Sequence, residues 1–97
     1  MNMNQNLTVN INSMSIQMAL GSASHTITAM TAIGFTVIRI EIIQHSRPTL
    51  VVQADSNTLK LVKDGKAVLY CHGSDDNGPF KKYQCPMGNC RIVWEER

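Results

Sequence analysis

Residues 14–35 read MSIQMALGSASHTITAMTAIGF, and this stretch decides the fold. Its apolar side chains recur every three or four residues, a spacing that lines one face of a helix; they are Ile16, Leu20, Ala23, Ile27 and Met30. Ser13 or Ser15 can cap the start. Gly34 suits the left-handed residue that commonly follows a helix, with Phe35 as its apolar neighbour. The sequence therefore predicts a helix over residues 13–34.

After Gly34 the apolar pattern changes to every second residue, which is typical of strands with one buried face. Asp64-Gly65 is a strong hairpin signal, and the Gly- and Asp-rich residues 73–79 are typical of a loop. Residues 36–95 are therefore expected to form an antiparallel sheet, with strands at 37–43, 49–53, 58–62, 67–71, 80–85 and 90–94 around the turns between them.

The expected fold is α+β, with one main N-terminal helix packed on an antiparallel sheet of short hairpin-connected strands. The chain has 97 residues, so a single domain over 1–97 is predicted. Residues 1–6 are expected to be a loose polar lead. Leu7–Ile11 alternates apolar and polar residues, which predicts a further short strand that could pair with another chain.

Charge is distributed unevenly along the chain. Nine Lys and Arg oppose seven Asp and Glu, a formal net charge of +2, and residues 1–38 contain none of these four residue types. This net charge is too small to require nucleic acid or an anionic membrane as the partner. No apolar run reaches the roughly 18 residues that a transmembrane helix needs, and no secretory signal is visible. Three cysteines cannot all pair within one chain, so a reducing cytoplasmic setting is expected.

The chargeless helix is the first candidate site. Depletion of charge is typical of the cores of protein interfaces, and small residues let another backbone approach closely. We interpret the helix as a docking surface for a protein partner or a second copy of the chain, the alternative being an ordinary helix with a Ser/Thr face. The candidate contact residues are Met14, Gln17, Leu20, Ala23, Ser24, Ile27 and Thr31.

A second candidate is a zinc site in the C-terminal third. Zinc favours four tetrahedral thiolate and imidazole ligands, and the candidates are Cys71, His72, Cys85 and Cys90. Neighbouring strand residues point to opposite faces, so His25, His45 or Asp75 is an alternative fourth ligand. Two other interpretations stay open: the cysteines are small buried apolar residues, or Cys85 and Cys90 form a reversible disulfide.

Nucleic-acid binding is the alternative function. Lysines interleaved with aromatic residues on a sheet can contact phosphates and stack on bases; the candidates are Lys60, Lys63, Lys81, Lys82, Arg91, Tyr83 and Trp94. The competing interpretation is a solvated face over core aromatics. A third class is a small ribonuclease-type toxin using His45 or His72 for acid–base catalysis.

The leading expectation is a small non-enzymatic interaction protein that binds and modulates or inhibits a larger macromolecular partner. Its size and lack of a catalytic motif are typical of accessory proteins of phages and mobile elements, here acting on a host protein. No cofactor other than zinc is expected, and no membrane association.

Overall fold

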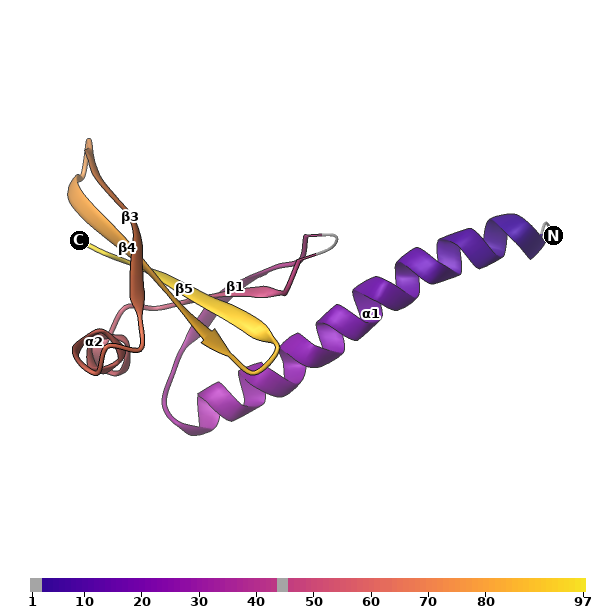
Figure 1. Cartoon of the computed structure of the whole chain (residues 1–97), viewed down its shortest axis with the longest axis horizontal. Coiled ribbons are helices and arrows are strands. Elements are labelled where there is room, and N and C mark those ends of the chain that lie inside the picture. The colour runs from indigo at the N-terminus through magenta and orange to yellow at the C-terminus, as the bar shows by residue number, and fades with distance from the viewer. Residues whose placement is uncertain (1–2, 44–45) are drawn as a thin grey trace.

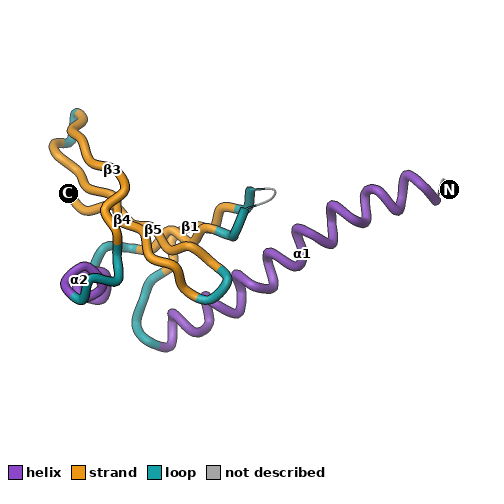
Figure 2. Tube along the Cα trace, in the orientation of Figure 1, coloured by secondary structure: helices purple, strands orange, loops and turns teal. Residues whose placement is uncertain are grey.

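The computed structural model describes residues 3–43 and 46–97 and confirms a small α+β fold (Figure 1). One long helix and one short helix accompany a five-stranded sheet, as Figure 2 shows by colour. In chain order the elements are α1 (Met3–Ala32), β1 (Val37–Glu41), β2 (Thr49–Val52), α2 (Ser56–Lys63), β3 (Val68–Asp75), β4 (Gly78–Met87) and β5 (Cys90–Glu96).

The sheet is mostly antiparallel, with strand order β1-β2-β5-β4-β3. The predicted arrangement of successive hairpins needs one correction, because β2 and β5 lie side by side and run parallel, with Leu50 opposite Ile92. The last strand therefore fills the centre of the sheet and joins the β1–β2 hairpin to the β3–β4 hairpin. A parallel neighbour needs a long connection, and residues 53–89 provide it.

Helix α1 ends where the sequence predicts and begins earlier. The N–H of Phe35 donates to the carbonyl of Met30 and that of Gly34 to Thr31, the hydrogen bonds of a Schellman motif, and Gly34 has φ of 97°. The predicted strand over Leu7–Ile11 is wrong, as is the loose lead over residues 3–6, because both are helical. Residues 1 and 2 lie outside the described part. No proline or glycine interrupts residues 3–20, so the helix continues through this segment.

Helix α2 replaces the predicted strand over Thr58–Val62. Asp55 caps its start, accepting hydrogen bonds from the backbone N–H groups of Asn57 and Thr58, while the Thr58 hydroxyl accepts from the N–H of Asp55. Asp64-Gly65 then ends this helix instead of turning a hairpin. The N–H of Lys66 donates to Leu61 and that of Gly65 to Val62, so both helices end in the same motif.

The predicted loop over residues 73–79 is largely strand. β3 continues to Asp75 and β4 begins at Gly78, so Asp76 and Asn77 alone make the turn. The β4–β5 turn is also shorter than predicted, because Pro86 and Met87 belong to β4.

The core lies between the sheet and the C-terminal half of α1. Ala23 and Met30 are fully buried there, and Leu61 and Val62 bring α2 to the same cluster. Phe35, between α1 and β1, is also buried in this cluster, and the sheet contributes Leu50, Val52, Cys85, Cys90, Ile92 and Trp94. Because the core ends near Ala23, the preceding turns of α1 extend past the sheet.

The projecting helix makes the molecule elongated. Its radius of gyration is 16.5 Å, against about 12.5 Å for a compact chain of this length. Figure 1 shows the N-terminal half of α1 running beyond the sheet, near the β1–β2 connection. Neither described helix has the apolar character that crossing a bilayer requires.

Candidate interaction surfaces

The projecting half of α1 carries exposed apolar side chains on several sides. Between residues 11 and 20 only Ala19 is half-buried and the rest are exposed. Met18 is 72% exposed and Met14 is 57% exposed, while Ile16 and Leu20 continue the stripe of Ala23 and Met30 beyond the core. Large apolar side chains grouped in this way are typical of a surface that another molecule covers.

The predicted contact residues divide into two groups. Ala23 has no exposed surface and is closed to a partner, and Ile27 is partly buried against the core. The other five are exposed and follow one side of the helix, and we call them the outer strip: Met14, Gln17, Leu20, Ser24 and Thr31.

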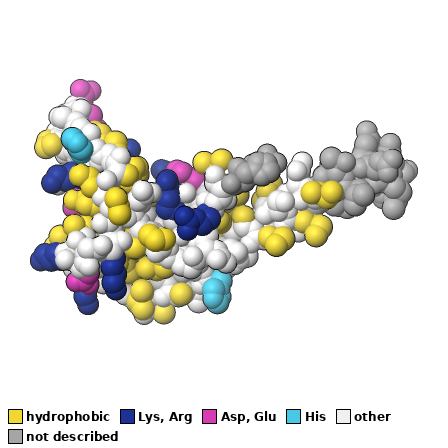
Figure 3. All heavy atoms as spheres, in the orientation of Figure 1, with side chains coloured by type: hydrophobic (Ala, Val, Ile, Leu, Met, Phe, Trp, Pro, Cys, Tyr) yellow, Lys and Arg dark blue, Asp and Glu magenta, His cyan; other side chains and the backbone are white. Residues whose placement is uncertain are grey.

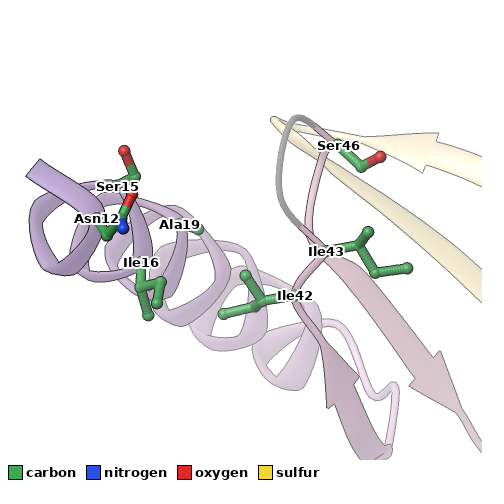
Figure 4. A pocket seen from close by; sticks show the side chains of 7 residues that line it. All are labelled: Asn12, Ser15, Ile16, Ala19, Ile42, Ile43 and Ser46. Carbon is green, nitrogen blue, oxygen red and sulfur yellow. The ribbon is translucent and has the colours of Figure 1, made fainter.

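A groove lies between α1 and the chain that follows β1. Its volume is about 430 Å³, and we call it the α1–β1 groove; its lining residues are Asn12, Ser15, Ile16, Ala19, Ile42, Ile43 and Ser46. Figure 4 shows Ile42 extending toward the helix on the side of Ile16. This groove is not among the predicted sites. The adjacent pair Ile42 and Ile43, which follows β1 and interrupts the alternation of residues 38–42, is the sequence sign of a segment with apolar side chains on both sides.

The helix contributes no Asp, Glu, Lys or Arg to either the outer strip or the α1–β1 groove. The first charged residue in the sequence is Arg39, after the helix has ended, and it pairs with Glu41 at 2.9 Å. In the face shown in Figure 3, charged side chains gather over the sheet and α2, and the described part of the projecting helix is hydrophobic or neutral. Burial of this helix by another molecule therefore has no charge to desolvate.

The four predicted zinc ligands lie on three strands. Cys85 and Cys90 are core residues on β4 and β5, whereas Cys71 is half-buried and His72 exposed on β3. Burial raises the pKa of the Cys85 thiol, which disfavours the thiolate that a metal needs. Within residues 3–43 and 46–97, no group of three or more His, Cys, Asp or Glu side chains is arranged to hold a metal. The zinc site stays a prediction.

The structure separates the predicted nucleic-acid-binding residues. Trp94 is buried and stacks with the partly buried Tyr83, with ring centroids 5.9 Å apart, so both aromatic rings belong to the core. Lys60 and Lys63 lie on α2, whereas the remaining basic candidates lie on the sheet: Lys81, Lys82 and Arg91. The Arg91 guanidinium lies over the Tyr70 ring, and its Nη1 donates to Gln84.

Of the two predicted catalytic histidines, His45 lies outside the described residues. His72 lines a shallow groove of about 370 Å³ together with Lys81, Phe80 and the C-terminal Glu96 and Arg97. Arg97 is engaged by Asp75 and Glu95 at 2.8 and 3.4 Å. Glu96 accepts a hydrogen bond from the Trp94 indole. Among the residues of this groove, His72 is the predicted catalytic residue and Lys81 is a predicted nucleic-acid contact, whereas Glu96 and Arg97 are not among the predicted site residues.

The chain belongs to a protein family whose description is "uncharacterised protein" and whose model matches residues 2–97. Neither the curated proteins nor the solved structures include a match to the chain.

Proposed function

We propose that this chain is a small non-enzymatic interaction protein that binds a larger protein through the outer strip of α1 and modulates or blocks it. The supporting observation is the exposure of Met14 and Leu20, at 57% and 46%, on the projecting half of α1, which the chain's own sheet does not cover.

The chemistry of the outer strip indicates what the partner surface is like. Gln17, Ser24 and Thr31 offer polar groups without charge, and Met14 and Leu20 offer adaptable apolar contacts. A partner surface rich in charge would lose hydration and gain no ion pair here. We therefore expect a partner surface that is itself depleted in charge, as the cores of protein interfaces are.

The proposed setting is the cytoplasm. Cys71, Cys85 and Cys90 are free thiols, and free thiols persist in a reducing compartment.

Site-specific photo-crosslinking in the cells that make the protein tests the proposal. A photo-reactive amino acid replaces Gln17 in one variant and Asp76, on the β3–β4 turn, in the control. We expect a specific crosslinked protein from position 17 and none from position 76. The same yield at both positions, or no product at position 17, would contradict the proposed function.

Once crosslinking has identified the partner, the contribution of the outer strip to binding is tested by measuring the affinity of a variant. Leu20→Asp places an unpaired carboxylate in the contact, so we expect at least a tenfold loss of affinity, about 1.4 kcal/mol. The far-ultraviolet circular dichroism is expected to stay unchanged, because Leu20 lies outside the core. Unchanged affinity in the variant would show that the outer strip is not the contact.

A further inference from the structure

We infer that the α1–β1 groove is covered by the same groove of a second copy of this chain, so that two α1 helices pack antiparallel about a two-fold axis. The groove faces a different side of α1 from the outer strip. Successive helical residues are about 100° apart, which places Ala19 in the groove nearly opposite Gln17 and Ser24. The dimer therefore goes beyond the proposed function, and each can fail without the other.

The exposed area of one chain is large enough for such a contact. The accessible surface is 6843 Å², whereas a compact monomer of 10.8 kDa exposes about 5500 Å². The excess of about 1300 Å² exceeds the roughly 800 Å² that each partner buries in an interface of standard size. A second copy covering the projecting helix and its groove would bring the exposed area of this chain closer to that of a compact folded protein.

The shape of the patch suits a copy of itself. A two-fold interface uses one patch on both subunits, so that patch must hold a protrusion and a matching hollow. Here the protrusion is the projecting half of α1, and the hollow beside it is the groove of about 430 Å³. Ser15 and Ala19 on the groove side of the helix are small, which lets a second helix approach closely between Ile16 and Ile42.

The charge pattern also favours a second copy. The helix residues that line the groove are uncharged, and Ile42 and Ile43 are the apolar residues opposite them. Two positively charged chains of net charge +2 can thus meet here without like charges in contact. A partner carrying charge to this groove would find no opposite charge among the residues that line it, whereas an identical groove brings only uncharged lining residues to the contact.

Size-exclusion chromatography with light scattering on the purified chain tests the inference. We expect a mass about twice 10.8 kDa at micromolar concentration. Ala19→Arg places a cation in the groove of each copy and is expected to yield a monomer. Gln17→Arg adds the same charge on the opposite side of the same helix and is expected to remain dimeric.

A second variant keeps the test informative if Ala19→Arg fails to fold. Ile43 forms the other wall of the groove and is 62% exposed, so Ile43→Asp is expected to dissociate the dimer without loss of the Trp94 fluorescence of the folded core. The inference is overturned if the unmodified chain is monomeric, or if Gln17→Arg dissociates it as fully as Ala19→Arg. If the chain is monomeric and position 17 still gives a crosslinked protein, the dimer is contradicted and the proposed function is supported.

Discussion

Arg97 closes the far end of the sheet with a bidentate ion pair. Its Nη1 and Nη2 atoms each donate to a carboxylate oxygen of Asp75 at 2.8 Å, and its guanidinium lies over the Phe80 ring. The hydrogen bonds from Arg97, aided by the N–H of Asn77, lower the pKa of Asp75 from 3.8 to about 2. The pair thereby fixes the C-terminal residue to the β3–β4 turn.

This pKa shift predicts how stability depends on pH. The Asp75 carboxyl is more acidic in the folded chain than in the unfolded chain, so its contribution is complete above pH 3.8 and is lost as pH falls toward 2. We expect Asp75→Asn to be slightly less stable than the parent at neutral pH. Urea unfolding at several pH values should show this difference shrinking below pH 3.8; a constant difference would contradict the assignment.

The three thiols are predicted to differ in reactivity. Cys71 is half-buried, whereas Cys85 and Cys90 are 5% and 0% exposed, so we expect one fast and two slow reactions with a disulfide reagent in the native chain. All three should react quickly in denaturant. The zinc prediction is checked in the same assay, because a chelator should speed the slow thiols if they hold zinc and leave them unchanged if they do not.

The sequence pattern predicts which residues of α1 share a face, but it does not predict how many of them are buried. Ala23 and Met30 are buried at the predicted helical spacing, because periodicity reports on which side chains share a face. Ile16 and Leu20 have the same spacing and remain exposed, since the sheet ends before it reaches them. How far a packing surface extends depends on the other element, and the pattern of one helix does not contain that information.

At the scale of elements, the cap of α2 carries its own prediction. The Oδ1 atom of Asp55 accepts hydrogen bonds from two backbone N–H groups of the first turn, and Asp55→Ala removes this shared acceptor. We expect the free energy of unfolding to fall by about 1 kcal/mol, measured by urea unfolding. Ser56→Ala, at the exposed neighbouring position, should change it little. An equal loss in both variants would show that the cap is not responsible.

The sequence of α2 contains signals for both a strand and a helix, and the cap is one of the helix signals. Thr58–Leu61 alternates polar and apolar residues over four positions, and so short a window fits either structure. Thr58 is three positions after Asp55, which is the spacing of a capping box. Gly65 follows three positions after Val62, so the sequence contains the signals of both a helix start and a helix end. Leu7–Ile11 was mistaken for the same reason, a short alternation within a longer helix.

The parallel pairing of β2 with β5 could not be predicted from local patterns. Each strand has the expected apolar residues, and the hairpins β1–β2, β3–β4 and β4–β5 join neighbours in sequence. The position of the β1–β2 hairpin beside β5 depends on the pairing of residues 49–51 with residues 91–93, which are far apart in the sequence. The α1–β1 groove is likewise made by residues far apart in the sequence, so it too was missed.

At the scale of the whole molecule, the inferred dimer predicts concentration-dependent stability. Association favours the folded state by mass action, so the thermal midpoint of the unmodified chain should rise with protein concentration. Ala19→Arg should have a midpoint independent of concentration, while Gln17→Arg should behave like the parent. Differential scanning fluorimetry over a hundredfold concentration range measures this. A flat response in the parent chain would contradict the dimer.

The central position of β5 also affects when the chain can fold during its synthesis. β5 carries Ile92 and Trp94 into the core and separates β2 from β4. While the ribosome is still translating the preceding residues, the two halves of the sheet have no strand between them, and their apolar faces stay open to water. Folding is therefore expected to finish only after residue 96 has left the exit tunnel, and nascent chains stalled earlier should be targets for chaperones and proteases.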